Sequence, residues 1–130
     1  MKLSEIVGAF SISFMRQYSQ HIKDKYKLIN FQLLYTSGSF DLIIFVVPKE
    51  KRKTGVGSQV MQELCAFADQ HQKKILLTPM HKDKFYGTTS YQRLVKFYQR
   101  FGFVENSGNN KEEKINAAMY RKPIKNNQLP

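Results

Sequence analysis

The chain has few of the residues that build disulfides and metal sites. Its single cysteine, Cys65, excludes a disulfide within the chain. Its three histidines, His21, His71 and His81, are isolated from one another and predict no metal site. The longest apolar run, Leu42 to Val47, is far too short to span a bilayer, and the N-terminus lacks the layout of a signal peptide. We therefore expect a cytoplasmic protein with neither a metal nor a membrane partner.

Acidic residues are scarce as well. Ten Asp and Glu face 21 Lys and Arg, which leaves a formal net charge of +11 at pH 7. An excess of this size suits an acidic partner, either nucleic acid or an anionic protein, or it serves solubility with no partner at all. The basic residues form no continuous stripe along the sequence, so charge alone does not decide between these interpretations.

The chain does have enough apolar sequence for one core. Hydrophobic residues make up 42% of its 130 residues, and ten Phe and seven Tyr are among them. This composition argues against disorder and fits a single domain, which we place at residues 1–124, with a C-terminal tail at 125–130. No internal repeat or linker divides the sequence.

Hydrophobic periodicity predicts a mixed α/β fold, because stretches with helical spacing alternate with short apolar runs. The expected elements are a helix over 3–22 with a break near 8–13, a hairpin of strands 28–35 and 40–47 around a turn at 37–39, a helix from about 60 to 72, a strand at 74–77, a helix from 90 to 101, and a strand pair at 103–105 and 115–121. The expected core includes Leu42, Ile44, Val46, Leu64, Cys65, Leu76, Leu94, Phe97 and Phe103.

The most informative segment joins the strand at 40–47 to the following helix. It is rich in lysine and carries the pattern Arg52-x-x-Gly55-x-Gly57. Glycines let backbone N–H groups approach a phosphate closely, and a helix N-terminus adds unpaired donors and a partial positive charge. The segment lacks the Gly-Lys pair of a P-loop and the third glycine of a dinucleotide fingerprint. It predicts a site for another phosphorylated ligand, with a solvated loop as the alternative.

A second segment, residues 94–103, carries Tyr98, followed after three residues by Gly102 and Phe103. Gly102 is suited to end a helix in the left-handed conformation. In this order, the two segments resemble the GNAT family of N-acetyltransferases, whose acetyl-CoA pyrophosphate loop reads (Q/R)-x-x-G-x-(G/A) and whose later helix ends in tyrosine, three residues and Gly-Phe. The resemblance covers about residues 28 to 122. Stretches such as 77–79 look like the small GNAT proteins carried by phages and mobile elements.

The resemblance implies an α/β (α+β) fold with a mixed, splayed sheet flanked by helices, and direct attack of an amine on acetyl-CoA. It places this cosubstrate against Val46, Val47, Arg52, Lys53, Thr54, Gly55, Val56, Gly57 and Ser58. Tyr98 is expected to give a proton to the departing thiolate, since a phenol pKa of about 10 lies near that of a thiol. Asp41 lies where histone-type relatives place a carboxylate base, although a role in the turn at 37–39 explains it equally well, and Glu105 is another candidate.

Other functions stay open at this level. One is a catalytically inactive GNAT-fold protein that binds nucleic acid or an acidic protein, as the net charge suggests. Another is an enzyme that uses a longer acyl-CoA, because no motif marks the acyl slot. The sequence names neither the acceptor amine nor the choice between monomer and homodimer.

Overall fold

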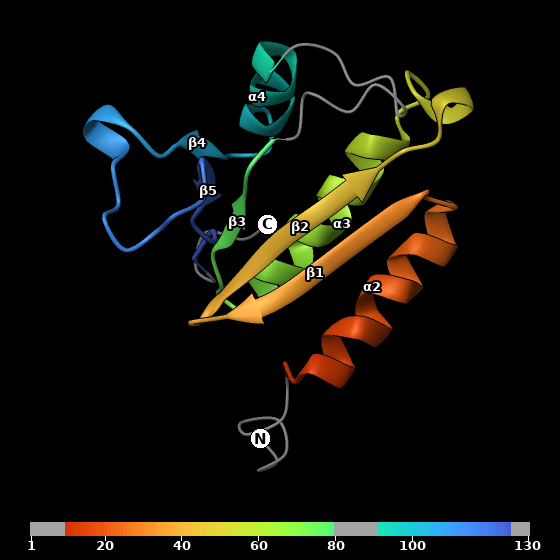
Figure 1. Ribbon diagram of the computed structural model, residues 1–130, viewed down its shortest axis with the longest axis horizontal. Coiled ribbons are helices and arrows are strands. Elements are labelled where there is room, and N and C mark those ends of the chain that lie inside the picture. Colours follow the sequence, from red (N-terminus) through yellow and green to blue (C-terminus); the bar gives the residue numbers. More distant parts are fainter. Residues whose placement is uncertain (1–9, 80–90, 126–130) are drawn as a thin grey trace.

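A computed structural model describes residues 10–79 and 91–125 of the chain (Figure 1). Within these ranges it contains helices and strands in alternation, and none of the helices is long and apolar enough to cross a membrane. In chain order the elements are α2 (Ile12–Tyr26), β1 (Asn30–Thr36), β2 (Ser39–Val46), α3 (Val56–Gln70), β3 (Ile75–Leu77), α4 (Tyr91–Gln99), β4 (Val104–Glu105) and β5 (Met119–Arg121). Of the expected tail at 125–130, residues 126–130 lie outside the described part of the chain.

The strands form one mixed sheet in the order β1-β2-β3-β5-β4. β1 and β2 make the predicted hairpin, in which Ser37 and Gly38 have φ angles of 52° and 83°. Two positive φ angles in such a short turn match the twist of the strands that it joins. β2 and β3 are parallel and connected by α3, whereas β3, β5 and β4 pair antiparallel. The predicted mixed α/β fold is confirmed.

β2 and β3 separate soon after they begin to pair. Their register runs only from Phe40 opposite Ile75 to Leu42 opposite Leu77, while β2 continues to Val46. In Figure 1 the two strands start side by side and then diverge, β2 toward the start of α3 and β3 toward α4. Among the described residues, the rest of β2 has no partner strand on this side. The sheet is therefore splayed, as the family resemblance implied.

A β-bulge at Ile43 changes which side chains of β2 face the core. The pairing with β1 shifts by one residue there, so that Ile43 has no partner of its own. Leu42 is buried before the bulge, and after it Phe45 packs against the core. The predicted core positions Ile44 and Val46 are therefore wrong, because strict alternation from Leu42 had assumed an unbroken strand.

The other predicted core residues lie in two environments. Three are buried as expected: Leu64, Cys65 and Phe103. Two are half-buried and pack against the core from α4: Leu94 and Phe97. The prediction for Leu76 is wrong, because its neighbours Ile75 and Leu77 fill the core and successive residues of a strand point to opposite faces.

α2 covers the free edge of β1. Its N-cap is Ser11, in line with the predicted break, and residues 3–9 of the expected helix lie outside the described part of the chain. The Ser19 hydroxyl accepts a hydrogen bond from the Leu33 N–H at 2.9 Å and donates one to the Leu33 carbonyl at 3.3 Å. These bonds satisfy main-chain groups that would otherwise remain open to another strand.

α3 covers the sheet face on which Phe40 lies. The ring of Phe67, in α3, lies 5.0 Å from the ring of Phe40 and is stacked on Tyr18 of α2 at 4.3 Å, measured between centroids. Aromatic pairs in these geometries add to the free energy gained from burying their area. α2, α3 and β2 are thus joined through one aromatic cluster.

A buried ion pair holds the last strand against α3. Arg121 of β5 donates two hydrogen bonds to the Asp69 carboxylate, at 2.8 and 3.0 Å, and the two side chains are 6% and 8% exposed. Asp69 also accepts a bond from the Ile124 N–H, and Arg121 donates one to the Phe101 carbonyl after α4. Burial alone would raise the pKa of Asp69, but these hydrogen bonds outweigh it and lower the pKa below its usual range.

Asp69→Ala should lower the free energy of unfolding by about 3–5 kcal/mol, because it leaves Arg121 buried without its charge partner. Urea denaturation at pH 7 measures this loss. The difference from the unmodified protein should shrink as the pH falls below about 4, since a carboxyl with a lowered pKa stabilises the fold only while it is ionised. Lys25→Ala, which removes an exposed pair with Glu63, is the control and should have far less effect. Equal effects would contradict the anchoring role.

Candidate active site

The segment between β2 and α3 is a loop that ends at an open helix N-terminus. A 3-10 turn, Lys49–Lys51, is followed by Lys53 with a φ of 67° and Gly55 with a φ of 90°. Gly55 is the N-cap of α3, and no described side chain caps the first N–H groups of this helix. The Arg52 guanidinium donates a hydrogen bond to the Val47 carbonyl at 3.2 Å and so closes the loop. The uncapped N–H groups and the helix dipole favour an anion here.

A cavity of about 470 Å³ opens between this loop and α4. Its lining contains two distinct kinds of side chain. The apolar ones are Phe45, Val46, Val47, Leu94 and Phe97. The basic ones are Lys51, Arg52, Lys53 and Arg100. Apolar walls suit an uncharged arm of a ligand, and the basic groups with the start of α3 suit its phosphates.

Gly57 allows the first turn of α3 to lie directly against α4. A Cβ atom at this position would lie 3.4 Å from Cζ of Phe97 and 4.0 Å from Cγ2 of Val47. A larger side chain would therefore have to displace Phe97 or enter the cavity. Close packing thus favours glycine here, in addition to the phosphate binding that the sequence pattern predicts.

Tyr98 reaches the same cavity from α4. Its ring packs against Phe97 and Phe103, with centroids 5.1 and 5.7 Å away, and the residue is 8% exposed. Burial alone raises its pKa above the usual value of about 10. In the described part of the chain no group accepts a hydrogen bond from its hydroxyl, which leaves the hydroxyl available to a ligand as a donor.

Arg100 is a cavity residue that the sequence analysis missed. Its guanidinium donates a hydrogen bond of 3.4 Å to the Ser58 hydroxyl in the first turn of α3, and it lies 5.6 Å from the centroid of the Phe97 ring. It thus bridges the two helices that border the cavity. The available signal was a basic residue close to Tyr98, but only the packing of α4 on the loop shows that Arg100 lines the cavity beside the start of α3.

Asp41 lies in a different hollow from Tyr98. This second hollow, of about 800 Å³, is lined by the start of β2, by β3 and by residues 114–117 before β5. Burial raises the pKa of the Asp41 carboxyl. The structure therefore does not bring Asp41 and Tyr98 into one cavity, and Glu105, which is exposed in β4, lines neither of them.

Within the described residues, neither Cys65 nor the potential metal ligands form a reactive site. Cys65 is buried on α3, and burial raises the pKa of its thiol to about 11, which disfavours a reactive thiolate. No cluster of three His, Cys, Asp or Glu side chains that could hold a metal ion occurs within residues 10–79 and 91–125. His81 lies outside these ranges.

The sequence matches the family model of the acetyltransferase (GNAT) domain over residues 15–105, which is most of the chain. The chain belongs to the GNAT family of acetyltransferases. Its likeness to the members carried by phages and mobile elements stays a prediction from the sequence. No curated protein matches the sequence.

Two solved structures are similar to this GNAT domain at low sequence identity. Ard1 from Thermoplasma volcanium is 17% identical, with a TM-score of 0.48, over 73% of this chain and 62% of that one. A putative acetyltransferase of the GNAT family from Bacteroides thetaiotaomicron is 18% identical, with a TM-score of 0.49, over 75% of this chain and 56% of that one. The match spans less than two thirds of the length of either protein.

The structure gathers most of the residues that the GNAT loop pattern implies. The cavity lining includes Val46, Val47, Arg52, Lys53, Gly55, Gly57 and Ser58, together with Tyr98 from α4. Two implied residues are not part of this lining. Thr54 turns its hydroxyl to the Lys51 carbonyl, and Val56 packs against the core. Their side chains hold the loop in shape, and their main-chain N–H groups still belong to the loop.

Gly57→Val should weaken the binding of acetyl-CoA by about 100-fold or more, equivalent to about 2.7 kcal/mol, because its γ carbons enter the cavity beside Phe97. Isothermal titration calorimetry measures the affinity. Gly57→Ala is the matched control, because its Cβ only reaches contact distance and most of the affinity should remain. Unchanged affinity in Gly57→Val would contradict the assignment of the loop, provided that thermal unfolding shows both variants to be folded.

Proposed function

We propose that the protein transfers an acetyl group from acetyl-CoA to an amine. The observation that carries this proposal is the meeting of the uncapped start of α3, four basic side chains and Tyr98 in one cavity. Membership of the GNAT family supports it independently. Acetyl-CoA would supply an acyl group already activated as a thioester.

The loop and the strand edge would hold the two parts of the cosubstrate. The N–H groups around Gly55 to Ser58 would receive the pyrophosphate, with Arg52 and Lys53 beside them. The open edge of β2 near Phe45 and Val46 would pair with the amides of the pantetheine arm, as an added strand does. A main-chain N–H of the same edge would stabilise the negative charge that develops on the acyl oxygen.

Tyr98 would act on the departing sulfur. The raised pKa keeps its hydroxyl protonated at neutral pH, so it is a donor and not a base. The same shift makes full loss of the proton harder than the sequence analysis assumed. Tyr98 would therefore hydrogen-bond to the thiolate and give up its proton only as the amine nitrogen releases one in return.

Tyr98→Phe should leave the affinity for acetyl-CoA nearly unchanged and lower turnover by about 10² to 10⁴-fold, because it removes the donor and keeps the buried ring. Calorimetry and a thiol-release assay with an accepted amine separate the two effects. In the unmodified enzyme, Tyr98 should cause no fall in rate below about pH 10, since its raised pKa keeps it protonated there. Full turnover in Tyr98→Phe would return this residue to a packing role.

Arg100→Ala should weaken acetyl-CoA binding, and more so at low salt, because an exposed charge contact is screened as the ionic strength rises. Calorimetric titration at two salt concentrations tests this. Lys96→Ala removes the same charge from α4 outside the cavity and is the control. Equal losses in both variants would mean that only the net charge matters.

The charge also supports a second candidate, a GNAT-fold protein that binds nucleic acid or an acidic protein. The cavity accounts for only four of the 21 basic residues. Competition separates the two functions, because DNA that binds through the cavity would displace CoA, whereas DNA bound elsewhere would not. CoA titrations with and without a DNA duplex therefore test both.

A further inference from the structure

The second hollow lies over the sheet face opposite α3. Asp41 alternates along β2 with the buried Phe40 and Leu42, and its register partner Leu76 alternates along β3 with buried residues in the same way. Both Asp41 and Leu76 line the hollow. Side chains that alternate with the core face must point away from it, so this hollow and the core lie on opposite sides of the sheet.

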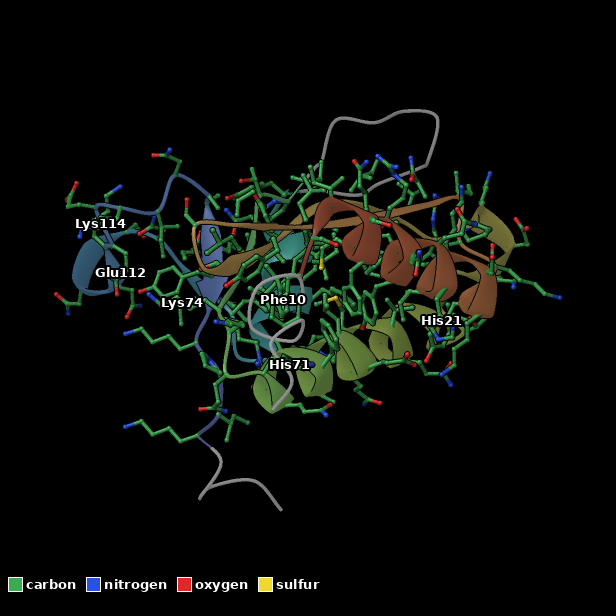
Figure 2. The ribbon with its side chains drawn as sticks, turned by 90° about the horizontal axis from the view of Figure 1, so that it is seen from below. Phe10, His21, His71, Lys74, Glu112 and Lys114 are labelled. Atoms are coloured by element: carbon green, nitrogen blue, oxygen red, sulfur yellow. The ribbon has the colours of Figure 1, made fainter. Side chains whose placement is uncertain are left out.

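The hollow carries charges of both signs that are not paired with each other. Asp41 supplies a carboxylate, and Lys74 and Lys114 supply two ammonium groups. The ion pairs found among residues 10–79 and 91–125 involve none of these three side chains. Figure 2 shows Lys74 and Lys114 at the same end of the molecule.

An unpaired, half-buried carboxylate loses solvation without gaining a partner. Desolvation is the sole cause of the raised pKa of Asp41, which agrees with the lack of a neighbouring cation. An ammonium group on a ligand would restore the missing partner. The two lysines would in turn receive an anionic group of the same ligand, and hydroxyls such as that of Ser39 add further hydrogen bonds.

The hollow also reaches the place where β2 and β3 separate. Ile43, the bulged residue, and Thr78, just beyond the end of β3, are part of its lining. The cavity for acetyl-CoA begins at Phe45, only two residues further along β2 than Ile43. A molecule in the hollow is therefore close along the strand to a thioester bound at the splayed edge.

We propose that this hollow binds the acceptor, and that the acceptor is a small zwitterion, an amine that also carries a carboxylate or a phosphate group. This inference rests on the proposed acetyl transfer. A polycation such as a polyamine is disfavoured, because the two lysines outnumber the one carboxylate and the whole protein carries a net charge of +11.

In the proposed reaction, Asp41 acts on the acceptor amine and Tyr98 acts on the sulfur of acetyl-CoA. The ammonium group of the acceptor gives one proton to Asp41 while it lies in the hollow. The neutral amine then reaches the splayed edge, where its lone pair forms the C–N bond to the acetyl carbon as the C–S bond breaks. The sulfur takes a proton from Tyr98, which regains one from the amine nitrogen. The products are the N-acetyl compound, CoA with a free thiol, and one proton that leaves through Asp41.

Matched amines test the proposal. The probes are ω-amino acids with two to five methylene groups and phosphoethanolamine, each compared with the same amine without its anion, plus spermidine. Binding is measured by calorimetry without acetyl-CoA, and turnover by thiol release with it. At least one zwitterion should bind about 10-fold more tightly than its anion-free counterpart, the size expected for a hydrogen bond to a charged group. The carboxylate and phosphate arms show which anion is preferred.

Substitutions test whether the preference for a zwitterion depends on the side chains of the hollow. Lys74→Met and Lys114→Gln should each reduce the preference for the zwitterion and leave the affinity of the plain amine unchanged, whereas Asp41→Asn should weaken both. Lys96→Met removes the same charge outside the hollow and should change neither. An unchanged midpoint of thermal unfolding and an unchanged affinity for acetyl-CoA show that a variant is folded. If the change at Lys74 disturbs β3, the variant at the exposed Lys114 provides the test instead.

The outcomes separate this inference from the proposed function. The assignment of the hollow would be overturned if plain amines or spermidine bound as tightly as every zwitterion. It would also be overturned if the preference for the zwitterion remained after both lysine substitutions, even in a protein that uses acetyl-CoA. Zwitterion binding that depends on Lys74, in a protein that does not bind acetyl-CoA, would support the hollow and overturn the acetyl transfer.

Discussion

The early end of the β2–β3 pairing is the constraint on which the rest of the structure depends. Parallel strands that paired along their whole length would leave no open edge between them. Here the pairing stops at Leu42 and Leu77, and α3 and α4 approach on the widening side, where Gly57 lies against Phe97. The free edge of β2 follows from that separation, and the cavity forms where this edge meets the uncapped start of α3.

Local backbone geometry could be predicted from the sequence, because it depends on residue type. Gly102 has the expected left-handed conformation after α4, with a φ of 93°, and the turn around Ser37 and Gly38 closes the hairpin as expected. The basic loop with Gly55 and Gly57 also lies where its pattern predicted, between a strand and a helix. Each of these features is decided within a few residues along the chain.

Features that depend on two distant segments could not be predicted. The bulge at Ile43 exists only in the register with β1, so the sequence of β2 alone predicted alternation through Ile44 and Val46. Arg100 joins the cavity only because α4 packs beside Ser58, forty-two positions earlier in the chain. Asp41 was singled out in the sequence as a candidate carboxylate, but the hollow that it lines forms only where β2, β3 and residues 114–117 come together.

β2 connects the two hollows of the molecule and sets the distance between them. Asp41 lies near its start and Val46 at its end, five residues further, which is about 16 Å along an extended strand. A bulge shortens and bends a strand, so the extra residue at Ile43 brings the two ends closer than a regular strand would. It also turns Phe45 toward the core, so that the strand can line the cavity beyond the bulge while Asp41 faces the other side before it. One irregular residue thus allows a single strand to line the cavity beside the start of α3 at one end and a charged hollow at the other.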